Sequence, residues 1–242
     1  MPARKLVAIH QPNFLPWLGY FDKLARADVF VLLDNVQFPR TSKGTWMNRV
    51  KLLVGAKAAW VTVPIVRAEG SVRVVRDVRI DDSQPWRTKV LRTIEHNYRR
   101  APHFADVFPI VEEVVSAPTD NLADYNERGV RRLASELGLD AAKFVRSSSL
   151  SVKGHASELL AELTRAVGGS AYLTGGLAPE AYQEDEKFAA AGVEVVYQDF
   201  QHPTYPQPVD PPVHGLSIVD ALMNCGIAGT SELVEHAALA RR

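Results

Sequence analysis

The chain has only one cysteine, Cys225, among its 242 residues. A single thiol excludes an internal disulfide and a thiolate-rich metal site. Cys225 stands beside Gly226 without a C-x-x-C or other activating pattern, which favours a buried, inert thiol. Metal-binding motifs such as H-E-x-x-H are also absent, so we expect a metal-independent protein with no bound cofactor.

An excess of charge of either sign is missing as well. The 28 basic and 28 acidic residues give a formal net charge of zero, so we expect no nucleic-acid partner. No stretch approaches the roughly 18 apolar residues of a membrane span, and the basic start lacks the apolar length of a signal peptide. We therefore expect a cytoplasmic enzyme or binding protein.

Two apolar segments with a helical pattern between them open the chain. Residues 5–10 and 29–33 are typical of buried strands, and residues 17–27 have the spacing of an amphipathic helix. Together they predict a β-α-β unit with short connections. Because strand and helix patterns alternate again near the end, we predict an α/β fold in which a Rossmann-like, mainly parallel sheet is assembled from both ends of the chain.

The other elements follow from periodicity and from capping or turn residues. We treat residues 1–242 as a single α/β domain with an insertion of short strands and helices at about 46–140. The insertion has predicted strands at 50–53, 60–66 and 74–80 and helices at about 85–100, 104–115 and 121–137. Beyond it we predict strands at 144–150, 171–174 and 193–200 and helices at 155–167, 180–191, 216–225 and after 231.

Polar residues follow the first two predicted strands. His10, Gln11 and Asn13 end the first, and Asp34 and Gln37 end the second. Since the carboxyl ends of parallel strands form the ligand crevice of an open sheet, these side chains predict a site there. His10 is the leading candidate because an imidazole with an ordinary pKa of about 6.5 can act as general base or acid. The alternative is a buried histidine bonded to the backbone.

Asp34 has two interpretations. It either orients His10 or holds the amine of a substrate, or it caps the turn that ends the second strand. Gln37 and Asn48 offer donors and acceptors that could fix a polar ligand. The turn Thr174-Gly175-Gly176, ahead of the helix near Glu180, could present backbone N–H groups to an anion, although it lacks the established phosphate-loop spacings.

A second polar cluster, residues 201–207, directly follows a predicted strand. It contains His202, Tyr205 and Gln207, and Tyr205 is held between prolines, which suits a binding wall. Ordinary loop packing is the alternative. Ser217, Asp220 and Asn224 share one helix face, and they either cap and solvate the helix start or contact substrate.

These segments resemble the WbqC-like protein family over nearly the whole chain. The matching motifs are Ile9-His-Gln-Pro-Asn-Phe-Leu-Pro-Trp-Leu-Gly-Tyr-Phe-Asp-Lys23, Ala27-Asp-Val-Phe-Val-Leu-Leu-Asp-Asn-Val-Gln-Phe38, Trp46-x-Asn-Arg49, Trp60-x-Thr-Val-Pro64, His202-Pro-x-Tyr-Pro-Gln207, Leu216-Ser-Ile-Val-Asp220 and Asn224-x-Gly226. The resemblance implies a site containing His10, Gln11, Asn13, Asp34 and Gln37, with Tyr205 and Gln207 on its opposite wall.

The resemblance also implies an activity. It suggests an acyl- or aminoacyltransferase that moves a glycyl or other acyl group from an activated donor, such as a thioester, to a small-molecule amine or amino sugar. An acyl or aminoacyl carrier protein is the implied partner, in surface-polysaccharide or natural-product biosynthesis. His10 would take the proton of the attacking amine, Asp34 would hold His10 or the ammonium, and Asn13 or Gln11 would stabilise the oxyanion.

Two other functions stay open. Residues 10–13 faintly resemble the H-x-G-H motif of nucleotidylyltransferases, which suggests a nucleotidyltransferase-like or adenylating enzyme that uses ATP. A non-catalytic protein that binds a sugar or a carrier is the third interpretation.

Overall fold

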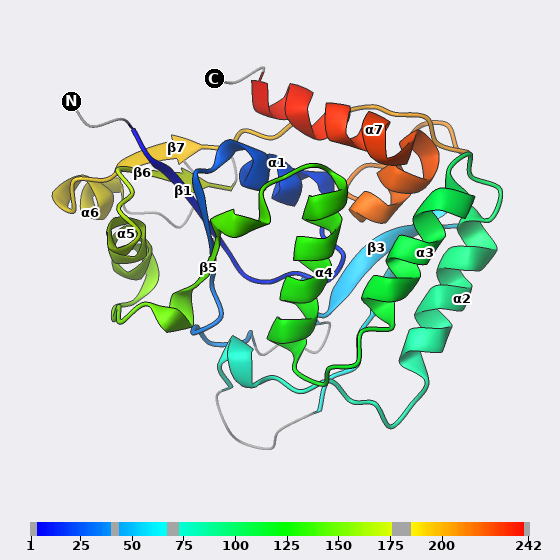
Figure 1. Cartoon of the computed structure of the whole chain (residues 1–242), viewed down its shortest axis with the longest axis horizontal. Helices are drawn as coiled ribbons and strands as arrows, with labels where there is room; N and C mark the ends of the chain where they lie inside the picture. Colours follow the sequence, from blue (N-terminus) through cyan, green and yellow to red (C-terminus); the bar gives the residue numbers. More distant parts are fainter. Residues whose placement is uncertain (1–3, 40–43, 67–72, 176–184, 240–242) are drawn as a thin grey trace.

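A five-stranded parallel sheet runs through one half of the protein, on the left in Figure 1. The computed structural model describes residues 4–39, 44–66, 73–175 and 185–239. The strands are β1 (Leu6–His10), β2 (Val29–Leu32), β5 (Phe144–Arg146), β6 (Ala171–Thr174) and β7 (Glu194–Tyr197). They lie in the order β5-β2-β1-β6-β7, so strands from both ends of the chain share one sheet, which confirms the predicted α/β fold. Numbered by chain position, this order is 3-2-1-4-5, as in doubly wound nucleotide-binding sheets.

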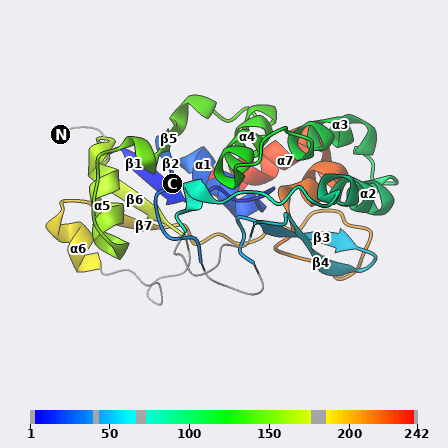
Figure 2. The same cartoon turned by 90° about the horizontal axis from the view of Figure 1, so that it is seen from below.

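Helices cover both faces of the sheet. Helices α5 (Ala156–Ala166) and α6 (Asp185–Ala190) lie on one face, and α1 (Leu18–Arg26) and α4 (Leu122–Glu136) lie on the other (Figures 1 and 2). Side chains alternate between the faces along β1. Val7 and Ile9 pack in the cluster that includes residues of α5 and α6, whereas Ala8 packs in the cluster of α1 and α4.

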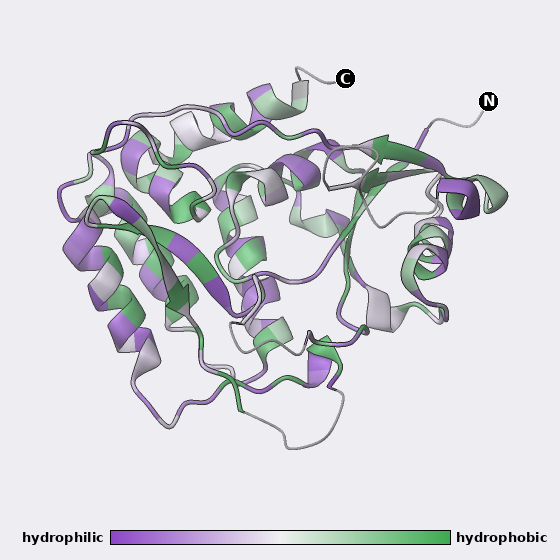
Figure 3. Cartoon of the chain, turned by 180° about the vertical axis from the view of Figure 1, so that it is seen from behind, coloured by the Kyte–Doolittle hydropathy of each residue, from purple (hydrophilic) through white to green (hydrophobic). Residues whose placement is uncertain are grey.

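The inserted region lies beside the sheet, except for its last helix, α4, which covers one face of the sheet. It contains the antiparallel hairpin of β3 (Arg49–Val54) and β4 (Lys57–Thr62), followed by helices α2 (Trp86–Tyr98), α3 (Phe104–Val115) and α4. Hydrophilic and hydrophobic residues alternate over Arg49 to Leu52, the first four residues of β3 (Figure 3). Its buried residues join the core, while Trp60 on β4 stays 41% exposed beneath the guanidinium of Arg49.

The strand predicted at 74–80 is wrong. This segment contains a 3₁₀ turn, Val75–Asp77, with isolated bridges on both sides. Val75 and Val78 are both buried, and their separation of three residues matches a 3₁₀ turn and not the alternation of a strand. The backbone N–H groups of Val75 and Arg76 donate to Val36 and Asp34, so this segment ties down the chain that leaves β2.

The last helical span, α7 (Ile218–Leu239), consists of two helices that meet at a kink, in agreement with the two that the sequence predicts at 216–225 and after 231. It bends at Gly226, whose φ of 72° is in the left-handed region that glycine adopts without steric cost. A side chain at this position would also meet the ring of His103, 2.8 Å from where its Cβ would lie. The glycine therefore allows both the bend and the close approach of the segment before α3.

A buried carboxylate, Asp220, joins α7 to α2 and to the loop after β7. Asp220 is 0% exposed and accepts hydrogen bonds from the hydroxyls of Tyr98 and Tyr205, both at 2.8 Å, and from Nε2 of Gln207 at 3.0 Å. The Tyr98 hydroxyl in turn accepts from the N–H of Leu53 at 2.9 Å. Burial raises the pKa of Asp220, and the three donors oppose that shift.

We expect Tyr98→Phe to lower the free energy of unfolding by about 1–3 kcal/mol, because it leaves the Leu53 N–H and one oxygen of a buried carboxylate short of a partner. Urea denaturation measures the change. Tyr197→Phe is the matched control, since its hydroxyl bonds the carboxylate of Asp185 at the surface. That control should change stability by less than about 0.5 kcal/mol. Equal effects of the two variants would contradict a structural role for the Asp220 network.

Candidate functional site

A small cavity opens where strand order reverses, at the carboxyl ends of β1 and β6. Its volume is about 150 Å³. The lining residues come from the end of β1, the start of α1 and the ends of β6 and β7: His10, Trp17, Gly19, Tyr20, Lys23, Gly175, Gln198 and Phe200. In open parallel sheets, ligands bind in the crevice at this reversal of strand order. The cavity is smaller than the roughly 300–1,000 Å³ typical of sites for drug-sized ligands, so it suits a small group.

Trp17 and Phe200 form the aromatic wall of the cavity. Their ring centroids are 5.1 Å apart in an edge-to-face arrangement. The Trp17 ring also lies against Gly19, where an added Cβ would come within 2.3 Å of the indole. Glycine at position 19 thus lets the tryptophan fold back over the first turn of α1 and close one side of the cavity.

His10 occupies the last position of β1 and points toward α1, on the same side of the sheet as Ala8. Its ring centroid is 4.8 Å from that of Tyr20. Its Nδ1 is 3.1 Å from the carbonyl oxygen of Gln11. Because a carbonyl only accepts hydrogen bonds, this contact assigns the proton of the neutral ring to Nδ1 and leaves Nε2 as the basic nitrogen. Desolvation, and after it the charge of Lys23, lowers the pKa of His10 to about 3, so the ring is neutral near pH 7.

Lys23, on α1, lines the same cavity. Its side chain is 3% exposed, and within the described residues its ammonium has no hydrogen bond or ion pair. A Cβ at Gly175 would lie 3.6 Å from Lys23 Nζ, so the amine faces the end of β6. The pKa of Lys23 is lowered to about 8, chiefly by burial; the charge of Asp22 opposes this shift and that of Arg26 adds to it.

Asp22 belongs to a different set of contacts beneath the cavity. Its Oδ2 accepts from Nε2 of Gln198 at 2.7 Å and lies 3.8 Å from the guanidinium of Arg26. Gln198 Nε2 also donates to the Gly19 carbonyl at 2.6 Å. One carboxylate, Asp22, thus lies near two cations, since its charge acts on Lys23 as well as on Arg26. The two positive charges are therefore only partly compensated by Asp22, and no described residue forms an ion pair with Lys23.

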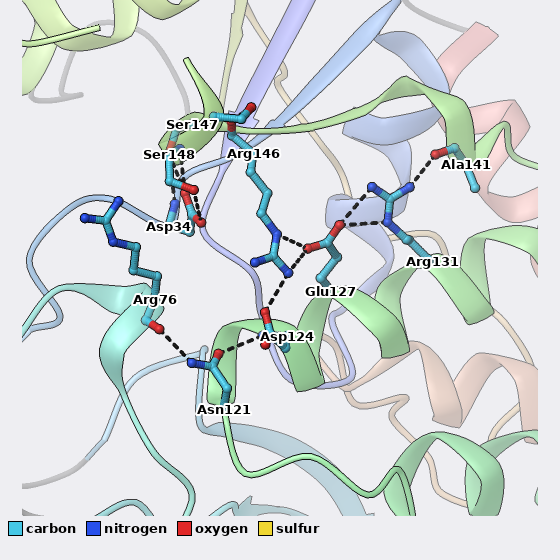
Figure 4. Close-up of polar contacts among 11 residues, drawn as sticks. Asp34, Arg76, Asn121, Asp124, Glu127, Arg131, Ala141, Arg146, Ser147 and Ser148 are labelled. Atoms are coloured by element: carbon cyan, nitrogen blue, oxygen red, sulfur yellow. Dashed lines mark hydrogen bonds and ion pairs between the residues drawn. The ribbon is translucent and has the colours of Figure 1, made fainter. Parts of the chain in front are cut away.

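Among the described residues, no hydrogen bond joins Asp34 to His10. Its carboxylate is 1% exposed and accepts from the hydroxyls of Ser147 and Ser148 and from the Ser148 N–H, at 2.7–3.0 Å (Figure 4). Figure 4 also shows Arg146 nearby, bound to Asp124 and Glu127 of α4. The Asp34 contacts join the end of β2 to the end of β5, which agrees with the capping interpretation.

Four further predicted residues, like Asp34, lie outside the cavity lining. Gln11 contributes its backbone carbonyl to His10 and to the Tyr20 hydroxyl, and Asn13 is buried in the loop before α1. Gln37 is exposed, in a bridge with Val74. Asn48 is buried and bonds backbone groups of Thr45 and Val63, so its amide stabilises the turn before β3.

The residues of the second predicted cluster, 201–207, lie in two different places: His202 lies at the aromatic wall, whereas Tyr205 and Gln207 do not. The His202 ring lies 4.9 Å from that of Trp17, so this histidine supports the aromatic wall from behind. Burial lowers its pKa, as does the neighbouring His214. Tyr205 and Gln207 instead bond Asp220, and Gln207 also pairs with the backbone of Val213. Tyr205 and Gln207 therefore belong to the buried Asp220 network.

The residues that sequence reasoning missed are chiefly Lys23, Tyr20 and Gln198. One signal was available: Lys23 lies three residues after Tyr20, on the same side of the predicted helix, where a lysine is unusual. Gly175 was part of a predicted anion-binding turn, but Gly176 and Glu180 of that prediction lie outside the described residues. Cys225, predicted to be buried, is only half-buried; this burial and the charge of Asp220 raise the pKa of its thiol.

Two further searches of the structure concern metals and membranes. Among the described residues, no group of three or more histidine, cysteine or acidic side chains is placed to hold a metal ion. Within the same residues, no helix has the length and apolar character needed to cross a membrane.

Comparisons with known proteins agree with the motifs in the sequence. The chain is 29% identical over 224 residues to Rv1507c of Mycobacterium tuberculosis (strain ATCC 25618 / H37Rv), a protein named as uncharacterized, and the match covers 92% of this chain and 94% of the relative. No solved structure matches the chain significantly. Residues 11–232 match the WbqC-like protein family, so the chain belongs to that family.

Proposed function

We propose that the protein is an acyl- or aminoacyltransferase that uses the cavity at the ends of β1 and β6 to join a glycyl or other small acyl group to an amine. One observation carries the proposal. A neutral imidazole, His10, lines a small cavity at the reversal of strand order, and its Nε2 is left free to accept a proton.

The reaction needs no nucleophile from the protein. The substrate amine attacks the carbonyl carbon of a thioester, a C–N bond forms, and the C–S bond breaks. His10 Nε2 takes the proton from the attacking nitrogen and passes it to the departing thiolate, so the products are an amide and a thiol. Neither Gln11 nor Asn13 lines the cavity, and the proposal assigns no oxyanion donor to them.

The small volume of the cavity supports an acyl group of glycyl size. A volume of about 150 Å³ accommodates the reacting ends of two small substrates and leaves the carrier and the rest of the acceptor outside. The aromatic wall of Trp17 and Phe200 keeps water from the reacting carbonyl. Sugar or carrier binding without catalysis would give the half-buried imidazole no role.

We expect His10→Ala to lower kcat for acyl transfer by about 10²–10⁴-fold, the range of a lost general base. The assay incubates the protein with acyl-CoA or acyl-carrier thioesters and nucleotide-linked amino sugars and follows the amide product by mass spectrometry. His96→Ala is the matched control, because His96 is exposed on α2, away from the cavity. Unchanged product formation by His10→Ala would remove His10 from the mechanism.

A larger side chain at Gly175 should block the cavity. An alanine Cβ there would lie 3.6 Å from Lys23 Nζ and 3.8 Å from Gln198 Oε1, which are ordinary contacts. We therefore expect Gly175→Ala to melt within about 2 °C of the wild type and Gly175→Leu to raise KM or abolish turnover. Steady-state kinetics and thermal denaturation measure the two effects. Full activity of a folded Gly175→Leu variant would place the reaction elsewhere.

An adenylating or nucleotidyl-transferring enzyme is the second candidate, supported by the 3-2-1-4-5 strand order. Binding of a phosphate at a helix N-terminus requires the motif to lie in the first turn of the helix. Helix α1 begins only at Leu18, so residues 10–13 lie before the helix and do not meet this requirement. Consumption of ATP in the same assay, dependent on His10, would favour this second function over thioester chemistry.

A further inference from the structure

Lys23 is an unusual group to find inside the protein without a partner. Its side chain is 3% exposed, it lines the cavity with His10, and no described residue pairs with its ammonium. Buried charges are normally paired, because an isolated ion in a medium of low dielectric constant is strongly destabilising. No described residue therefore supplies a counterion for this amine. The counterion must come from outside the described residues.

The charges around Lys23 define that counterion. On its own helix, Asp22 and Arg26 carry opposite charges and lie 3.8 Å apart. From β1, the neutral ring of His10 faces the cavity. From α1, Tyr20 contributes a hydroxyl group, and burial raises the pKa of that hydroxyl. The groups from β6 and β7, Gly175 and Gln198, are uncharged. The residues that line the cavity therefore have a net charge of about +1, that of Lys23, which matches one monoanion.

We infer that the cavity binds a carboxylate on Lys23, and that the acceptor in the proposed reaction is a small amine that carries this carboxylate close to its nitrogen. This inference rests on the proposed function, because it names the substrate class of the same cavity. A carboxylate has the single negative charge that the site lacks, whereas a phosphate dianion would leave a second charge unpaired. An amino acid or an amino sugar acid has the required chemistry.

The arrangement joins binding to catalysis. The charge of Lys23 is one of the two causes that lower the pKa of His10, after desolvation. A carboxylate bound to Lys23 neutralises that charge, so the pKa of His10 rises and its Nε2 becomes a stronger base only when the acceptor is present. Lys23 acts here as a substrate-binding residue that also controls the basicity of His10.

The first test is a binding experiment that needs no turnover. Wild-type protein is melted with sodium acetate, glycine or inorganic phosphate, each compared with sodium chloride at equal ionic strength. We expect acetate or glycine to raise Tm in the wild type and in Lys89→Met, a control at an exposed position of α2, but not in Lys23→Met. Equal shifts in Lys23→Met, no carboxylate shift in the wild type, or a shift with phosphate alone would each overturn the inference.

Lys23→Met should itself fold well, because methionine fills the space of the lysine stem without a buried charge. The sign of its effect follows from the lowered pKa. A lysine whose pKa falls from 10.5 to about 8 on folding contributes full stability above pH 10.5 and loses it as pH falls through 8. We therefore expect Lys23→Met to melt higher than the wild type at pH 7, and the difference to shrink toward pH 10.5.

The pH dependence of binding and the titration of His10 give readouts that a merely structural lysine would not affect. Carboxylate affinity should change little between about pH 6 and 7 and fall about tenfold per pH unit above 9, as Lys23 loses its proton. In NMR titrations, the His10 pKa should rise on addition of acetate and also in Lys23→Met. A His10 pKa that neither change moves would overturn the coupling.

Binding and turnover separate this inference from the proposed function. Lys23-dependent binding of carboxylates with no acyl transfer to any amine would retain the inference about the anion site and remove the transferase. Acyl transfer that depends on His10, with an unchanged KM in Lys23→Met, would retain the transferase and overturn the carboxylate-bearing acceptor.

Discussion

The central strand β1 is hydrogen-bonded on both edges, to β2 and β6, and covered by helices on both faces. This confinement leaves the strand one register and one orientation, because a shift of one residue would exchange its two sets of buried side chains. Val7 and Ile9 must then face α5, and Ala8 and His10 must face α1. The chain continues from β1 to β2 on one side, and the later strand β6 lies on the other side, so the strand order reverses at β1. The crevice opens at the carboxyl end of β1 for this reason. The position of His10 and of the cavity follows from these constraints.

Three buried polar groups near the ends of the strands show how differently such groups are used. Asp34 receives three donors from Ser147 and Ser148, and Asp220 receives three from Tyr98, Tyr205 and Gln207. Both carboxylates connect elements that are distant in sequence, and both have their hydrogen-bonding capacity occupied. Lys23 differs because its ammonium has no such partners in the described chain. Saturated groups stabilise the fold, whereas the unsaturated one has capacity left for a ligand.

The fold supports this unpaired charge with the packing around it. The Trp17 ring lies over Gly19, Phe200 meets that ring edge-on, and Gln198 bonds both the Gly19 carbonyl and Asp22. These contacts hold the start of α1 against the ends of β6 and β7 and bury the Lys23 side chain, which lowers its pKa. An unpaired buried charge lowers the stability of the folded protein, and the hydrophobic layers on both sides of the sheet compensate for this loss. Active sites commonly lower the stability of the proteins that contain them in this way.

Elements with strong periodicity were predictable from the sequence. Strand β6, Ala171–Thr174, and helix α3, Phe104–Val115, have the bounds predicted from their apolar spacing. The region around Val75 was predicted wrongly, because valines favour strands in general but here are buried at a spacing of three residues. His10 could be identified from its place at the end of an apolar run.

The partners of the polar residues could not be predicted in this way. Asp34 meets Ser147 and Ser148, and Tyr205 meets Asp220, through contacts that depend on how strands and helices pack. Lys23 gives the clearest case. In the sequence it is one lysine of an amphipathic helix, and such a lysine is usually solvated. By itself the sequence determined the order of the elements, the parallel sheet and the place of His10, because apolar periodicity is a local property. Only the tertiary structure decided that Lys23 is buried beside His10, because the ends of β6 and β7, about 150 or more residues later in the chain, are what cover it.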